Sequence, residues 1–137
     1  MFLINYLAVV AALVAFTLLG MLWYGPLFGK RWMKLAGFSP GDMNTPEAKK
    51  SAMIGYIASF VSSFVGMLTL AIVLKLLDIN NALGGLIAGA LLSLGFIATT
   101  LVGEAAWYGK PAELILLNSM YRISGFSIAG LIIGAWQ

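Results

Sequence analysis

The residues most able to do chemistry are a few polar side chains inside long apolar stretches. Arg122 lies well inside the stretch 114–136, and Glu104 lies near the end of the stretch before it. A charged side chain at membrane depth costs roughly 3 kcal/mol, so it normally has a partner. Helical side chains lean toward the helix amino terminus, which directs Arg122 toward Asn118 and toward the level of Glu104. Because Thr100 is one turn from Glu104, we expect all four side chains to form one polar patch.

The polar patch has two interpretations. It is either a binding or gating site for a small polar or anionic group, or a structural ion pair that holds two helices in register. Interhelical polar contacts commonly serve packing, which favours the structural interpretation. A binding or transport site would place Glu104 and Arg122 in contact with water, whereas a structural pair would keep both side chains dry.

Several kinds of chemistry are excluded by residues that the sequence lacks. It has no Cys and no His, which excludes thiolate nucleophiles, imidazole bases and nearly all zinc sites. It also has no phosphate-binding loop. We therefore expect no metal and no cofactor, and the sequence assigns no catalytic residue. An enzyme would have to use Tyr, Arg, Glu or Ser side chains, so a role without catalysis is the favoured interpretation.

The elements that must position the polar patch are four apolar stretches. Of the 137 residues, 61% are hydrophobic and 9% are charged, whereas a soluble domain usually has about a quarter charged residues. A helix of about 20 residues crosses the hydrocarbon layer, and only helices satisfy the backbone there in segments of this length. The sequence therefore predicts an all-α, polytopic membrane protein, with residues 1–137 as one integral membrane domain. The expected spans are 2–24, 52–77, 82–106 and 114–136.

Aromatic residues mark the ends of two of these spans. Trp23 and Tyr24 precede a Gly-Pro pair, and Trp107 and Tyr108 precede a Gly-Lys-Pro sequence. Such residues are typical of the aromatic belts at membrane interfaces. The shared Trp-Tyr-Gly triplet indicates either a duplicated helical hairpin, which would give a parallel repeat, or two belts acquired independently.

The first connecting loop carries most of the positive charge. Phe28, Trp32 and Leu35 recur at helical spacing there, which predicts a short interfacial helix. Loops rich in Lys and Arg normally face the cytoplasm. We therefore expect loops 25–51 and 107–113 to be cytoplasmic and both termini to be outside the cell or in the periplasm. The basic residues of the first loop are Lys30, Arg31, Lys34, Lys49 and Lys50.

Small residues recur at four-residue spacing in the last two spans. Such a pattern lets two helices approach closely in a membrane. It predicts either an interface between copies of the chain or packing within the four-helix unit. The small residues are Gly85, Gly89 and Ser93 in the third span, and Gly130 and Gly134 in the fourth.

The run from Asn5 to Lys34 contains a specific motif, which extends from Leu22 to Lys34 and reads LWYGPLFGKRWMK. It resembles the opening of a bacterial membrane protein family known as domain of unknown function 1761. The similarity extends in architecture over nearly the whole chain, including four spans and a long basic first loop. The resemblance implies a small protein of the bacterial cytoplasmic (inner) membrane. It supplies no catalytic or binding residue.

Three functions fit these features. The favoured hypothesis is a homo-oligomeric module, embedded in the lipid bilayer, that binds or passes a small solute or ion. A second is a membrane enzyme acting on lipophilic substrates, similar to four-span membrane glutathione transferases, for which Asn118, Tyr121 and Arg122 supply suitable side chains. A third is an accessory or scaffold subunit. Nucleic acid is not an expected partner, because the basic residues lie beside predicted spans.

Overall fold

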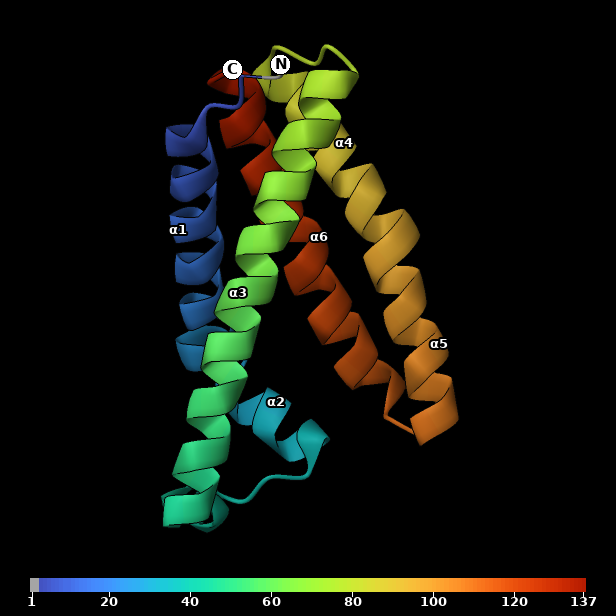
Figure 1. The fold of residues 1–137 in the computed structure, drawn as a ribbon. Coiled ribbons are helices and arrows are strands. Elements are labelled where there is room, and N and C mark those ends of the chain that lie inside the picture. The colour runs from blue at the N-terminus through green and yellow to red at the C-terminus, as the bar shows by residue number, and fades with distance from the viewer. Residues whose placement is uncertain (1–2) are drawn as a thin grey trace.

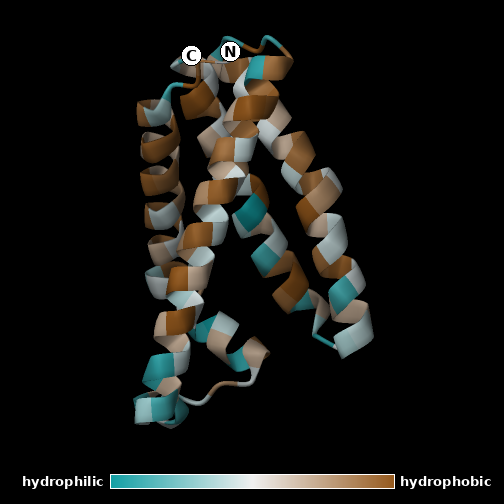
Figure 2. Ribbon diagram, viewed as in Figure 1, coloured by the Kyte–Doolittle hydropathy of each residue, from teal (hydrophilic) through white to brown (hydrophobic). Residues whose placement is uncertain are grey.

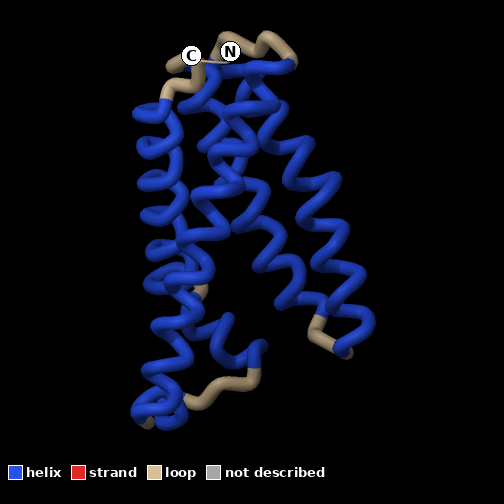
Figure 3. The backbone as a smooth tube through the Cα atoms, viewed as in Figure 1, coloured by secondary structure: helices blue, strands red, loops and turns tan. Residues whose placement is uncertain are grey.

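The computed structural model describes residues 3–137, which form helices and no strand (Figure 1; Figure 3). In this range, four helical stretches are long and apolar enough to cross a membrane. This confirms the predicted all-α fold with four spans. The helices in chain order are α1 (Tyr6–Leu22), η1 (Trp23–Leu27), α2 (Gly29–Ala36), η2 (Pro40–Asn44), α3 (Pro46–Leu76), α4 (Ala82–Leu92), η3 (Ser93–Ala98), α5 (Thr99–Tyr108) and α6 (Ala112–Ala135).

Short polar side chains start three of the long helices. Asn5, Thr45 and Asn81 precede α1, α3 and α4, and the side-chain oxygen of each accepts a hydrogen bond from a backbone N–H of the first turn. Such caps satisfy donors that the helix leaves unpaired. Asn5 also donates a hydrogen bond of 2.8 Å to the carbonyl oxygen of Trp136. This bond ties the start of α1 to the end of α6.

A tight π-type turn redirects the chain from α1 into α2. The Phe28 N–H donates to the carbonyl oxygen of Trp23, five residues earlier, at 2.9 Å. Pro26 lacks an N–H, and Gly25 has a non-helical backbone (φ −104°, ψ −108°). Helix α2 then ends at Gly37, whose φ of 80° is a left-handed conformation that glycine adopts readily. The predicted short helix of the first loop is thus present as α2.

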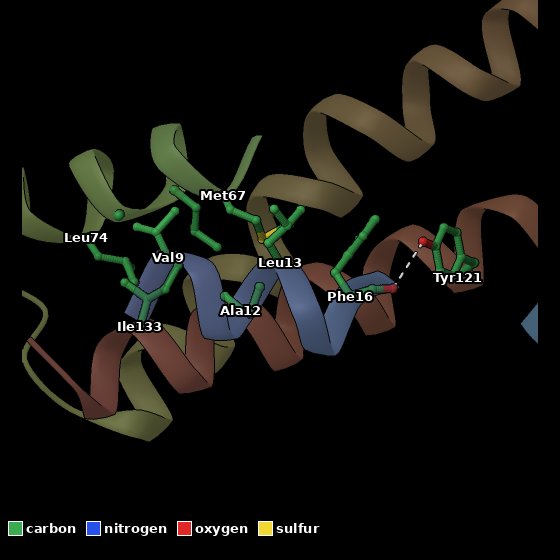
Figure 4. Close-up of a cluster of buried hydrophobic side chains, with 11 residues drawn as sticks. Val9, Ala12, Leu13, Phe16, Met67, Leu74, Tyr121 and Ile133 are labelled. Atoms are coloured by element: carbon green, nitrogen blue, oxygen red, sulfur yellow. Dashed lines mark hydrogen bonds between the residues drawn. The ribbon is translucent and has the colours of Figure 1, made fainter. Parts of the chain in front are cut away.

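The apolar core lies between α1, α3 and α6 (Figure 4). Its side chains come from all three helices and point toward one another. The hydroxyl of Tyr121 donates a 3.4 Å hydrogen bond to the carbonyl oxygen of Phe16 at one edge of this core. The core side chains with 2% exposure or less are Val9, Ala12, Met67, Ala71, Leu74, Ala129 and Ile133.

Helices α4 and α6 pack with their backbones almost in contact. A Cβ atom added at Gly85 would collide with the carbonyl oxygen of Gly130, and one added at Gly130 would collide with that of Gly85. A Cβ at Gly89 would likewise collide with the Phe126 carbonyl, and a Cβ at Gly134 would lie 3.1 Å from the Gly85 Cα. The small residues of the two spans therefore meet each other within one chain, because only glycine permits this approach.

The start of α1, the end of α6 and the turn between α3 and α4 lie at the same end of the molecule, as four crossings require (Figure 1). The other end carries α2, η2 and the turn between α5 and α6. Hydrophobic positions dominate the long helices, and hydrophilic positions gather in the first loop (Figure 2). Hydrophilic positions also interrupt the half of α6 nearer that loop.

Candidate functional site

A cavity of about 830 Å³ lies where α1, α3 and α6 separate. The three helices pack tightly near the chain ends, and the cavity opens beyond that core. Its size falls within the range of about 300–1,000 Å³ that is typical of small-molecule pockets. Most of its wall is apolar or aromatic. The side chains with polar groups on the wall are Thr17, Tyr24, Tyr56, Ser59, Ser63, Tyr121 and Arg122.

Arg122 is the charged residue of the cavity wall. Its guanidinium carbon lies 5.5 Å from the ring centre of Tyr121 and 5.9 Å from that of Phe16. Contacts of this kind between a cation and aromatic faces are attractive and gain strength away from water. Gly125 makes room for the Phe16 ring, because a Cβ at this position would collide with it. The absence of a side chain at position 125 thus lets Phe16 pack against α6, beside Arg122.

A hydrogen bond joins the first and last spans beside the cavity. The hydroxyl of Tyr24 donates to Oδ1 of Asn118 at 2.8 Å. The Tyr24 ring also packs edge-on against Tyr121, with ring centres 5.0 Å apart, and against Trp32 of α2 at 5.8 Å. Tyr121 therefore links the core to the first loop through a continuous group of aromatic rings.

Within residues 3–137, no hydrogen bond or ion pair joins Arg122 and Asn118 to the other two side chains of the predicted polar patch. Arg122 faces the cavity and Asn118 bonds Tyr24, whereas Glu104 and Thr100 lie exposed on α5. The Thr100 hydroxyl donates to the carbonyl oxygen of Phe96, one turn earlier in its own helix. The physical reason is that the close glycine contact with α6 belongs to α4. On α5, by contrast, a Cβ added at Gly103 would meet open space.

Neither Glu104 nor Arg122, the predicted ion pair, has an ionic partner within residues 3–137. The ion pair found in this range joins Arg31 of α2 to Glu113 in the first turn of α6, and both side chains are well exposed. Exposed pairs of this type contribute little to stability. Arg122 is therefore a half-buried cation without a carboxylate partner among the described residues.

The predicted interfacial aromatics lie in two different environments. Trp23 and Tyr24 pack against other rings of the protein, and Trp32 stacks on Phe38 with ring centres 5.8 Å apart. By contrast, Trp107 is 90% exposed and Tyr108 is 75% exposed. Ser93, which belongs to the predicted small-residue stripe, is fully buried and donates to the Gly89 carbonyl at 2.8 Å.

Sequence reasoning did not assign three residues to this site. Phe16 carried no signal, because it is one apolar residue in an apolar helix. The Trp-Tyr-Gly-Pro motif predicts an interfacial position for Tyr24 instead. From the sequence, Tyr121 is only a candidate side chain for an enzyme. The signal that was available is the spacing of Asn118, Tyr121 and Gly125, which places them along one side of α6.

The comparison with known protein families gives one match. A family model described as Protein of unknown function (DUF1761) covers residues 7–134. The chain belongs to the DUF1761 family. This confirms the resemblance seen in the first-loop motif. No curated protein and no solved structure matches this DUF1761 protein, so the function has to be argued from the site.

Proposed function

We propose that this DUF1761 protein is a multi-pass membrane protein that binds a small, partly apolar solute in the cavity between α1, α3 and α6. The observation that carries the proposal is a mostly apolar cavity of about 830 Å³ with the guanidinium of Arg122 at its wall. If Arg122 served only in a structural ion pair, a carboxylate would lie beside its guanidinium. No carboxylate within residues 3–137 forms an ion pair with Arg122.

The shape of the cavity also supports binding. Its rim is formed on one side by Tyr56, Ile57 and Phe60 of α3, which are between 55% and 76% exposed. Since α3 is long and apolar enough to cross a membrane, the exposed side chains in this part of it would face lipid. A solute with an apolar body would therefore reach the cavity sideways from the bilayer.

A cavity-filling substitution tests this proposal. We expect Ser59→Phe, on the cavity wall, to reduce saturable binding of the fluorescent polyenes cis-parinaric acid and its alcohol by about tenfold, since the added ring would take up space in the cavity. Binding is measured by energy transfer from the protein's Trp residues in nanodiscs of phosphatidylcholine, with empty nanodiscs as background. Ser62→Phe is the matched control, because Ser62 is exposed on α3 and does not line the cavity. Equal loss in both variants, or no saturable binding at all, would contradict the proposal.

We also propose that the end of the molecule carrying α2 faces the cytoplasm. The support is the concentration of Lys and Arg in the first loop. Because the chain has no Cys, single cysteines at Lys34 and Asn80 report the two sides separately. A membrane-impermeant maleimide should label Lys34→Cys only in inside-out vesicles and Asn80→Cys only in right-side-out vesicles. The reverse pattern would overturn the orientation, and labelling of both from one side would overturn the four-span arrangement.

A further inference from the structure

Some hydrogen-bond donors of the cavity wall already bond to other groups of the protein, and others do not. The Thr17 hydroxyl donates to the Leu13 carbonyl, and the Ser63 hydroxyl donates to the Ser59 carbonyl. The hydroxyls of Tyr24 and Tyr121 also donate within the protein, to Asn118 and to the Phe16 carbonyl.

Arg122 differs from these hydroxyls. Its guanidinium carries five N–H donors in a planar fork. It makes no ion pair with a residue in the range 3–137 and contacts the aromatic faces of Phe16 and Tyr121 instead. The Tyr56 and Ser59 hydroxyls also line the cavity and make no hydrogen bond within residues 3–137, but each is neutral and has a single O–H donor. Arg122 is thus the charged donor, and the one with the most N–H groups, that remains for a ligand. A ligand that satisfies it has to accept several hydrogen bonds at one point and has to be negatively charged.

The apolar part of the cavity wall favours a ligand that also has an apolar part. Met21, Ile57 and Phe60 supply apolar wall, and each is more than half exposed where the cavity opens. An anion without an apolar part would leave this wall unfilled and would have to cross lipid to arrive. A ligand with an apolar chain would bury the wall and enter from the bilayer.

We infer that the ligand of this cavity is an anionic amphiphile, with a single carboxylate or phosphate head on Arg122 and an apolar chain along α1 and α3. This inference rests on the proposed function and specifies the class of its ligand. Arg122 is the residue that selects the head group, because a forked guanidinium matches the two oxygens of a carboxylate or phosphate.

The experiment compares cis-parinaric acid with its neutral alcohol in phosphatidylcholine nanodiscs. We expect the acid to bind about tenfold more tightly than the alcohol, as a charge-assisted hydrogen bond allows. Arg122→Gln should remove this preference while the alcohol still binds, which shows that the variant remains folded. Arg122→Lys should retain part of the preference for the acid over the alcohol. Lys75→Gln is the matched control, since it removes a positive charge from α3 at a position outside the cavity wall.

The outcomes separate the ligand class from the proposed function. Equal binding of acid and alcohol, unchanged in Arg122→Gln, would overturn the anionic class and leave solute binding in place. Absence of saturable binding for both probes would overturn both proposals. Competition then distinguishes the two head groups: displacement of the acid by oleate indicates a carboxylate, and displacement by a lysophosphatidate indicates a phosphate. Displacement by neutral monoolein as effective as that by either anion would overturn the inference.

Discussion

Replacing Gly85 by alanine is expected to lower the free energy of unfolding by about 2 kcal/mol, the middle of the range for overpacking a close contact. The new Cβ would collide with the Gly130 carbonyl oxygen, which is backbone and cannot rotate away as a side chain does. Helices α4 and α6 would have to separate, and their association relies on close packing, since lipid supplies little hydrophobic driving force. The measurement is loss of helical circular dichroism as sodium dodecyl sulfate is titrated into the purified protein.

Gly103→Ala is the control for this prediction. It makes the same chemical change on α5, where the added Cβ meets open space. Alanine has the higher helix propensity, so this variant should be unchanged or slightly more stable. If the two substitutions destabilised the protein equally, the close contact between Gly85 and Gly130 would not be present in the folded protein.

Replacing Phe16 by alanine is expected to cost about 3 kcal/mol, the low end for truncating a buried aromatic side chain. The Phe16 side chain is 3% exposed and contacts three side chains of α6. It packs edge-on against Phe126, with ring centres 5.6 Å apart, and in a tilted arrangement against Tyr121, with ring centres 5.0 Å apart. It also provides one of the two aromatic faces beside Arg122. The low end applies because lipid, rather than water, surrounds these helices when they come apart.

The matched control is Phe96→Ala, because Phe96 is 71% exposed. The same detergent titration should place this variant within about 0.5 kcal/mol of the original protein, as expected for a surface substitution. A Phe16→Ala variant as stable as Phe96→Ala would contradict the packing of α1 on α6. Because the Phe16 side chain forms part of the cavity wall, we also expect its loss to enlarge the cavity.

The partner of Arg122 in the predicted polar patch could not be determined from the sequence. The sequence predicts that Arg122 is a charge inside a long apolar helix, and in the structure it lies in α6, one of the four helices apolar enough to cross a membrane. The choice of Glu104 as that partner depended on which side of α6 meets α5. Sequence periodicity could not decide this, because α6 is largely apolar all around. In the structure, the glycines hold α6 close to α4, while Arg122 faces the cavity toward α1 and α3.

Some predictions concern oligomeric assembly, internal duplication or the role of a residue, and they stay predictions. The homo-oligomer, the parallel repeat and the role of Glu104 belong to this group. The structure adds that Glu104 is exposed on a span and has no ion pair within residues 3–137. The small residues Gly85 and Gly130 contact each other within one chain, so an interface between copies would have to use other surfaces.

The sequence by itself determined the fold class, the family and the presence of four helices apolar enough to cross a membrane. A long apolar run that lies in lipid has to be helical, because an unpaired backbone N–H or C=O group is too costly in lipid. The first-loop motif marks the DUF1761 family. The tertiary structure alone decided which residues surround the cavity. The reason is that Phe16, Tyr24 and Arg122 are up to 106 positions apart in the chain (122 − 16), and only the packing of α1, α3 and α6 brings them together.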